Sequence, residues 1–139
     1  MNYKIVAKYI KEVQFQIPNP KTFFMLSKDI SNYKINININ SNQFKEKFIE
    51  VETMMSLNTV STEDDKIKTK IIYSAIVELN KNIKEKKELE EIILIKVPSE
   101  IYSSLRKSFI FLFEMSGFKD IKIEETVDFQ KLYLKNRIQ

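Results

Sequence analysis

The sequence contains no cysteine and no histidine, and it has one glycine in 139 residues. Without cysteine there is no disulfide framework and no thiolate nucleophile. Zinc sites built from cysteine and histidine, Ser-His and Cys-His nucleophilic pairs and a histidine general base are likewise excluded. A phosphate-binding loop or a dinucleotide fingerprint needs several glycines, so neither is present. These absences exclude most enzyme classes, and we expect no metal and no cofactor.

Charge and hydropathy narrow the possible classes of protein further. The 23 basic and 19 acidic residues leave a net charge of +4, which is too small to indicate a nucleic-acid-binding protein. The first ten residues hold no apolar run of signal-peptide length, and no apolar run is long enough to span a membrane. We therefore expect a soluble cytoplasmic protein, folded as a single domain over residues 1–139 with a core of its own.

Four segments of alternating apolar and polar residues predict an antiparallel sheet with one apolar and one polar face. They cover residues 5–17, 33–40, about 47–60 and about 66–79, with a turn predicted at 61–65 before the last. In the first segment Lys11 falls on the apolar face, which predicts a β-bulge at Lys11-Glu12 because one extra residue reverses the alternation. The inward-facing residues are expected to be Ile5, Ala7, Tyr9, Val13, Phe15, Ile17, Tyr33, Ile35, Ile37, Ile39, Ile49, Val51, Thr53, Met55, Leu57, Ile67, Ile71, Tyr73, Ala75, Val77 and Leu79.

A long helix is predicted over residues 98–118. Pro98 suits a first helical turn, and Gly117 suits the left-handed position that follows a helix. The apolar residues at helical spacing, which predict the buried face, are Ile101, Leu105, Phe109, Leu112 and Met115. Phe111 and Phe113 widen this stripe. Part of the helix is therefore expected to face another subunit, although an ordinary core helix remains the alternative for these two residues.

The remaining segments are shorter. Residues 21–30 predict a loop or a short helical turn whose apolar run, 23–26, either fills the core or lines a site. The charged part of 80–97 predicts a helical face exposed to solvent. Residues 127–137 predict a closing helix, with Asp128 placed near its start to match the helix dipole. Together the elements predict an α+β domain in which a long helix and a short C-terminal helix pack on one face of a four-stranded antiparallel sheet.

This order of elements, and three stretches of sequence, resemble the SecB family of preprotein-export chaperones. Residues 9–19 (YIKEVQFQIPN) are similar to the family's opening pattern of Tyr, Lys, acid, Phe and Pro-Asn. Residues 98–118, with their proline, Leu-Arg pair and aromatic-rich end, are similar to its long helix. Residues 127–133 (VDFQKLY) are similar to its closing Val-Asn-Phe and Leu-Phe. The resemblance covers most of the chain.

The resemblance implies a homotetramer, a dimer of dimers with the long helices packed between two sheets. This would explain the phenylalanines assigned to the subunit interface, which are Phe109, Phe111 and Phe113. It also implies an ATP-independent holdase without catalysis. Such a chaperone binds unfolded preproteins in long apolar grooves and keeps them competent for translocation, and it gains about 25 cal/mol for each Å² of apolar surface buried. Many weak contacts along one client chain then give tight, reversible binding.

The resemblance also implies which residues bind the client. The groove would be formed by the second strand and the last helix, through Tyr33, Ile35, Ile37, Phe129, Leu132 and Tyr133. The apolar run of 21–30 adds Phe23, Phe24 and Leu26. For the isoleucines, the alternative is an ordinary place in the core. Tyrosine suits a half-wet apolar surface, which favours the two tyrosines as binding residues.

The chain departs from the family on the outer face of the sheet. In the family this face is acidic and docks the motor SecA. Here Glu12 is retained, but Gln16 replaces a second acid, and Lys68 and Lys70 occupy the positions of an apolar residue and an acid. Charge reversal at an interface suppresses the original partner. Client holding is therefore expected to survive this divergence better than SecA docking does.

We therefore predict a holdase for protein export, with two alternatives left open. One is a SecB-like chaperone dedicated to a specific client, such as an antitoxin. The other is an interaction module of the same fold that holds no clients and uses Lys68 and Lys70 to bind one folded partner or an anionic surface. An enzyme ranks third, because the carboxylates of Glu12, Glu50 and Glu52 are expected on an open strand face and not in a pocket.

Overall fold

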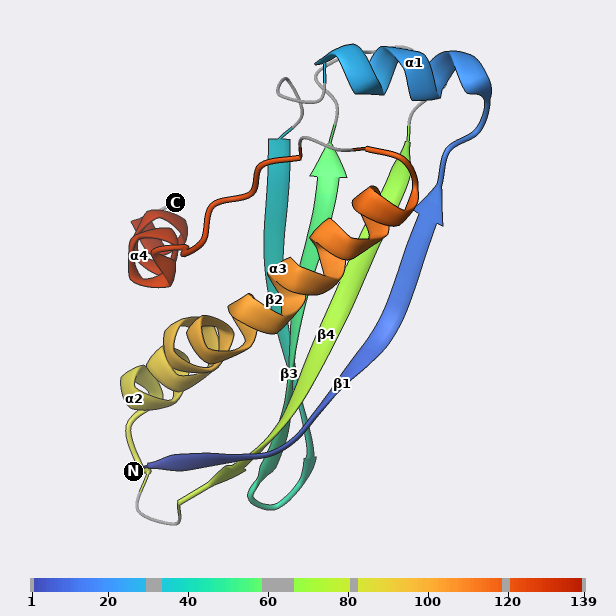
Figure 1. Cartoon of the computed structure of the whole chain (residues 1–139). Coiled ribbons are helices and arrows are strands. Elements are labelled where there is room, and N and C mark those ends of the chain that lie inside the picture. Colours follow the sequence, from blue (N-terminus) through green and yellow to red (C-terminus); the bar gives the residue numbers. More distant parts are fainter. Residues whose placement is uncertain (1, 30–33, 59–66, 81–82, 119–120, 139) are drawn as a thin grey trace.

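The computed structural model describes residues 2–29, 34–58, 67–80, 83–118 and 121–138. Tyr33 and the predicted turn at 61–65 lie outside these residues. A single antiparallel sheet has the long helix across one face, while the C-terminal helix lies beside the sheet (Figure 1). The predicted α+β fold is confirmed. The elements in chain order are β1 (Tyr3–Gln16), α1 (Pro20–Asp29), β2 (Lys34–Lys45), β3 (Phe48–Asn58), β4 (Lys68–Leu79), α2 (Lys86–Glu91), the π-helical segment η2 (Ile92–Lys96), α3 (Val97–Met115) and α4 (Phe129–Ile138).

The sheet has the order β1-β4-β3-β2, so β1 and β2 are its edges. Its inner face, which carries α3, is formed by the residues that the alternation in β2, β3 and β4 predicts. On this face, most of the buried side chains come from the central strands β3 and β4 and the residue just before β4, and they are Ile49, Val51, Thr53, Met55, Leu57, Ile67, Ile71, Ala75 and Val77. On the edge strand β2, Ile35, Ile37 and Ile39 are only partly buried against this core.

Strand β1 contains two irregularities in its pairing, and the alternation of apolar and polar residues in the sequence predicts one of them. The predicted bulge is confirmed, because the pairing register with β4 shifts at Lys11. A second shift occurs at Val6. Because each unpaired residue exchanges the two faces of a strand, Ala7 and Tyr9 lie on the outer face, where Tyr9 pairs with Ser74. The prediction that these two residues point inward is wrong.

The helix begins before Pro98, contrary to the prediction. It starts with α2, where none of the residues is buried, as expected for a solvated charged face. It then continues through η2 into α3. A proline lacks an N–H and its ring collides with the carbonyl four residues earlier. The wider π turn precedes it, with the Val97 N–H donating to the Ile92 carbonyl five residues back. The proline therefore follows a local change in helix type and does not start the helix.

The buried stripe of α3 advances in steps of four residues from Val97 to Phe113. Its fully covered members are Val97, Ile101, Leu105, Phe109 and Phe113. Met115, which was predicted to be buried, is 71% exposed. Phe109 and Phe113 are enclosed by their own chain, so the structure contradicts their assignment to a subunit interface. Phe111 projects from the other side of the helix and is 58% exposed.

The end of α3 depends on Gly117, as the sequence predicts. Its φ is +99°, a left-handed value that side chains disfavour. The Gly117 N–H donates to the Glu114 carbonyl (3.1 Å), and the Phe118 N–H donates to the Phe113 carbonyl (3.0 Å). This is the Schellman pattern, which satisfies carbonyls that the helix leaves free. A Cβ on Gly117 would lie 3.3 Å from Cζ of Phe23, so space is limited as well.

We expect Gly117→Ala to lower the free energy of unfolding by about 1–2 kcal/mol, because an L-residue must adopt the left-handed conformation. Urea-induced unfolding followed by circular dichroism measures this change. Ser103→Ala, at an exposed position within α3, is the matched control, and its effect should be neutral or slightly stabilising. Equal destabilisation by both variants would show that the turn at Gly117 does not hold the end of α3.

Candidate functional site

A groove with a volume of about 740 Å³ opens beside β2. We call it the edge groove. It lies between β2, α3 and the segment 121–127, which crosses from the end of α3 towards α4 (Figure 1). Its aliphatic lining comes from β2, the segment 121–127 and α4, and consists of Ile35, Ile37, Ile121, Ile123, Val127 and Leu132. The polar residues at the groove include Arg106 on α3 and three charged residues of the segment, Lys122, Glu124 and Glu125.

Two side chains of α3 hold the segment 121–127 in place by binding its backbone. The Tyr102 hydroxyl donates to the Glu124 carbonyl (2.6 Å), and Nε of Arg106 donates to the Ile123 carbonyl (3.0 Å). Burial raises the pKa of Tyr102, so the hydroxyl keeps its proton and remains a donor. Ile123, a residue of this segment, is buried. The wall of the groove is therefore attached to α3 and to the core.

Helix α4 is attached to the same part of the fold. Asp128 caps its start, with Oδ1 accepting from the Lys131 N–H (3.0 Å). Phe129 is buried and packs edge-to-face on Tyr102, with ring centroids 6.0 Å apart. The Tyr133 hydroxyl donates to Oε2 of Glu90 in α2 (2.7 Å). These contacts leave Leu132, which is 38% exposed, at the groove.

The structure brings together part of the predicted binding set. Ile35, Ile37 and Leu132 line the edge groove. Phe129 supports the groove from the core, and Tyr133 binds Glu90 and is not among the lining residues. Tyr33 lies outside the described residues. The isoleucines are half-buried, so each takes part in both the core and the groove wall.

The residues predicted on 21–30 do not reach the edge groove. They lie on α1, which crosses one end of the sheet (Figure 1). Leu26 is fully buried, and Phe23 packs on Phe118 with ring centroids 4.8 Å apart. Phe24 is 66% exposed and is not a lining residue. The core-filling alternative thus holds for Leu26 and Phe23.

The residues of the segment 121–127 are the part of the groove that the sequence patterns did not point to. The alternation of Ile121 and Ile123 indicates an extended link, but it does not say which edge of the sheet the link passes. The roles of Tyr102 and Arg106 as anchors also have no local signal, because both bind backbone carbonyls 22 and 17 residues away.

A second apolar groove, of about 470 Å³, lies on the opposite side of α3. We call it the β1 groove. Ile10 and Val13 of the edge strand β1 and Phe111 of α3 line it, and all three are about half exposed. Met115, one turn further along α3, is also exposed. Lys107 and Ser108 complete the polar part of its lining. Exposed apolar side chains gathered in this way make the surface a candidate interaction site.

The family model described as preprotein translocase subunit SecB matches residues 1–139. The chain belongs to the SecB family. A putative protein-export protein SecB of Pelagibacter ubique is 38% identical over 132 residues, covering 95% of this chain and 94% of that protein. A protein-export protein SecB of Anaplasma marginale is 23% identical over 141 residues, covering 94% of this chain and 79% of that protein. The family assignment drawn from the three sequence stretches is confirmed.

A solved structure shows the same fold. The SecB-like chaperone of Mycobacterium tuberculosis, in complex with a ChAD peptide from the HigA1 antitoxin, matches with a TM-score of 0.67 and 12% identity. The match covers 91% of this chain and 88% of that one. At this identity the likeness establishes the SecB fold of the chain. No helix in the described part of the chain is long and apolar enough to cross a membrane.

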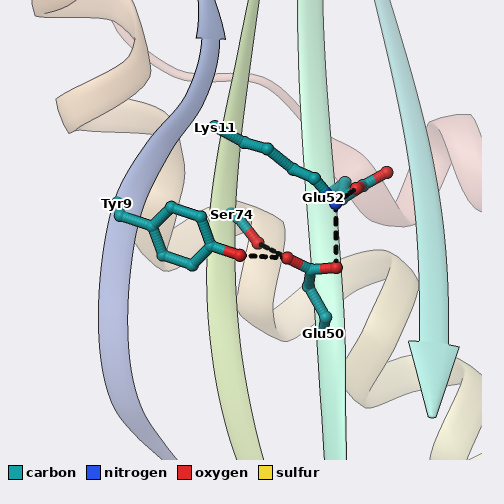
Figure 2. Close-up of polar contacts among 5 residues, drawn as sticks. All are labelled: Tyr9, Lys11, Glu50, Glu52 and Ser74. Carbon is teal, nitrogen blue, oxygen red and sulfur yellow. Dashed lines mark hydrogen bonds and ion pairs between the residues drawn. The ribbon is translucent and has the colours of Figure 1, made fainter. Parts of the chain in front are cut away.

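The outer face of this SecB-family sheet carries a network of five polar side chains (Figure 2). The Ser74 hydroxyl donates to Oε2 of Glu50 (2.7 Å), which also accepts from the Tyr9 hydroxyl. Lys11 donates to Oε1 of Glu50 (3.0 Å) and also binds Glu52. The hydrogen bonds from Tyr9 and Ser74, followed by that from Lys11, hold the pKa of Glu50 below its usual range. The network joins three strands, β1, β3 and β4.

The predicted SecB-family docking positions lie at one end of the same outer face. Lys70 forms an ion pair with Glu12 (2.7 Å), so the acid retained from the family pattern is paired within the chain. Gln16 pairs with Lys68 across β1 and β4. Among the described residues, no cluster of acidic side chains could hold a metal ion.

We expect Glu50→Gln to lower the free energy of unfolding at pH 7 by roughly 1–2 kcal/mol, because a charged acceptor of three hydrogen bonds is replaced. The folded-state pKa lies below the ordinary value of 4.5, so the contribution is present above that value and is lost as the pH falls through the folded pKa. The difference between the two proteins should therefore shrink below pH 4.5 in denaturant titrations at several pH values.

Glu78→Gln is the matched control for this experiment, because its carboxylate forms an exposed ion pair with Lys47 (3.2 Å) on the same sheet. Exposed pairs contribute little to stability, so this variant should stay close to the original protein at every pH. A Glu50→Gln deficit that is independent of pH would mean that side-chain shape and not carboxylate charge is responsible.

Proposed function

We propose that this SecB-family protein, a chaperone of protein export, holds unfolded client segments in the edge groove without ATP, catalysis or a cofactor. The observation that carries the proposal is the apolar wall beside an open sheet edge, formed by Ile35, Ile37, Ile121, Val127 and Leu132. The far wall of this groove is bonded to α3 through Tyr102 and Arg106. Because a preprotein is held before it crosses the membrane, the proposed location is the cytoplasm.

The size of the groove limits what one chain can do. A volume of about 740 Å³ accommodates only a few side chains of a client. Burying each apolar side chain contributes about 1.5–3 kcal/mol, from which the ordering of the client must be subtracted. One groove therefore binds weakly, and tight holding needs several grooves that one client chain engages together.

We infer that the β1 groove supplies this multiplicity by joining copies of the chain into the homotetramer. Ile10, Val13 and Phe111 form an exposed apolar surface on the side of α3 away from the edge groove. Covering this surface with a second copy would leave the edge groove of each chain open. Phe109 and Phe113 would contribute only by holding α3 in position.

Docking to SecA is the less supported part of a role in export. The ion pair between Lys70 and Glu12 neutralises the position where the family pattern is acidic. A SecB-like chaperone dedicated to one client, such as an antitoxin, would not need that docking, and the paired outer face is what favours this second candidate. An interaction module without clients would leave the edge groove without a use.

We expect Leu132→Asp to weaken the holding of an unfolded protein about tenfold or more, because it places a charge where an apolar side chain should be buried. The measurement is the suppression of aggregation of a chemically unfolded protein without ATP. Leu134→Asp is the matched control on the same helix, since Leu134 is exposed but does not line the groove. No suppression by the folded original protein would favour a dedicated client over general holding.

We expect Phe111→Asp to dissociate the assembly, because it introduces a carboxylate into the proposed apolar contact. Light scattering coupled to size-exclusion chromatography should then give the mass of a single chain or a smaller oligomer. Leu134→Asp should leave the mass of the original assembly unchanged. A Phe111→Asp variant with the original mass would place the subunit contact elsewhere.

A further inference from the structure

The hairpin that joins β2 to β3 presents two aromatic rings at one end of the sheet, away from α1 (Figure 1). Phe44 is 52% exposed, and its ring centroid lies 6.1 Å from that of the half-buried Phe48. The pairing register of the two strands shifts at Phe44. The side-chain amide of Gln43 donates to the carbonyls of Lys45 (3.3 Å) and Glu46 (2.8 Å). The turn is thus held by hydrogen bonds of its own while it keeps an apolar ring in water.

The end of the sheet around this hairpin is basic. The start of β1, the hairpin, the end of β4 and the residues that lead into α2 come together there (Figure 1). We call this region the hairpin end, and it consists of residues 2–4, 43–48, 78–80 and 83–88. Six lysines and four glutamates give it a net charge of +2, and they are Lys4, Lys45, Lys47, Lys84, Lys86, Lys87, Glu46, Glu78, Glu85 and Glu88.

Most of the lysines of the hairpin end are available to an anion. Lys47 pairs with Glu78 (3.2 Å), and its ammonium lies 5.9 Å from the ring centroid of Phe48. The other ion pairs found among the described residues involve Lys11 and Lys70, which lie outside the hairpin end. Five exposed lysines of this region therefore have no carboxylate partner in the described part of the chain.

A hollow of about 940 Å³ lies between the hairpin and the residues that follow β4. Its lining combines two lysines and a glutamate with three apolar side chains, and these are Lys45, Glu46, Lys47, Phe48, Leu79 and Ile83. Cations thus lie next to apolar surface, the combination that binds amphiphiles with anionic heads. None of these residues lines the edge groove, so a client held there leaves the hairpin end uncovered.

The shape and the small apolar area of the hairpin end favour a lipid surface over a folded protein. A stable protein interface buries about 800 Å² on each partner, whereas the exposed apolar surface here is mainly the ring of Phe44. A bilayer needs less, because an aromatic ring enters the headgroup region while each nearby lysine adds attraction to anionic lipids. A flat bilayer also reaches protruding parts first, and the hairpin lies at an extremity of the sheet (Figure 1).

We propose that the hairpin end binds the surface of an anionic lipid bilayer, with Phe44 in the headgroup region and the lysines at the headgroups. This contact lies on the membrane surface and crosses nothing. It goes beyond client holding, because it gives a chaperone of protein export a direct way to bring a held client to the membrane.

The first test is sedimentation of the folded protein with vesicles of phosphatidylcholine, either alone or mixed with an equal amount of phosphatidylglycerol. The mixed vesicles should bind about tenfold more tightly, and added salt should reduce the difference. A triple variant with Lys84→Gln, Lys86→Gln and Lys87→Gln should lose most of it. The matched control replaces three exposed lysines on α1 and at the start of β2 by glutamine, and these are Lys21, Lys28 and Lys34. It should bind the mixed vesicles more tightly than the charge-matched triple variant does.

The second test locates the contact. The chain contains no tryptophan, so Phe44→Trp introduces a single indole at the tip of the hairpin. Its emission should shift to shorter wavelength when mixed vesicles are added, because the ring leaves water. Phe24→Trp is the matched control, since Phe24 is 66% exposed on α1, away from the hairpin, and its emission should not shift.

Three results would overturn the proposal. One is no binding to mixed vesicles, as expected for a tip that binds an acidic protein instead. The second is equal binding to mixed and neutral vesicles. The third is a shift in Phe24→Trp without one in Phe44→Trp. Suppression of aggregation without vesicles tests the edge groove separately, so a failure of the membrane contact is distinguishable from a failure of client holding.

Discussion

The long helix is narrower than the sheet that it covers, and this difference determines which inward-facing residues remain exposed. A helix with its side chains is about 10–12 Å across, whereas four strands spaced about 4.8 Å apart make a sheet roughly 19 Å wide. α3 crosses the middle of the sheet and covers β3 and β4, whose inward residues are buried (Figure 1). The inward residues of the two edge strands are left half covered. These two strips become the edge groove beside β2 and the β1 groove beside β1.

The two strips differ in what borders them, and this difference separates their proposed roles. Beside β2, the segment 121–127 and α4 form an opposite wall, which Tyr102 and Arg106 anchor through backbone carbonyls. A client can therefore contact two walls there. In the described part of the chain, the β1 groove is lined by residues of β1, β4 and α3 alone, and its half-exposed Ile10, Val13 and Phe111 form an apolar surface that a second folded chain could cover. A groove with a second wall suits an extended segment, whereas the apolar surface beside β1 suits another folded chain.

The regular parts of this fold could be predicted because each residue's environment repeats with a short period. Alternation located the inward residues of β2, β3 and β4, and Gly117 marked the end of α3. Two of the errors arose where one residue breaks a period. The unpaired Val6 turns Tyr9 to the outer face, and the π turn before Pro98 lets the helix start earlier. The groove wall was partly predicted, through β2 and Leu132. Its anchors could not be predicted, because a bond between a side chain and a distant carbonyl leaves no local pattern.

The aromatic residues of α3 show why side-chain burial within a single chain must be known before residues are assigned to a subunit interface. Read from the sequence, Phe109, Phe111 and Phe113 look alike, since a helix of this kind is apolar on most sides. In the structure, the four-residue step takes Phe109 and Phe113 into the core and turns Phe111 towards β1. A second copy of the chain would cover Phe111 together with Ile10 and Val13. The proposal of an assembly therefore depends mainly on the exposed ring of Phe111. The charged side chains of the outer face pair with one another, as Lys11 does with Glu50 and Glu52 (Figure 2) and Lys70 does with Glu12. The proposed contacts with clients and with further copies of the chain therefore rest mainly on apolar surface.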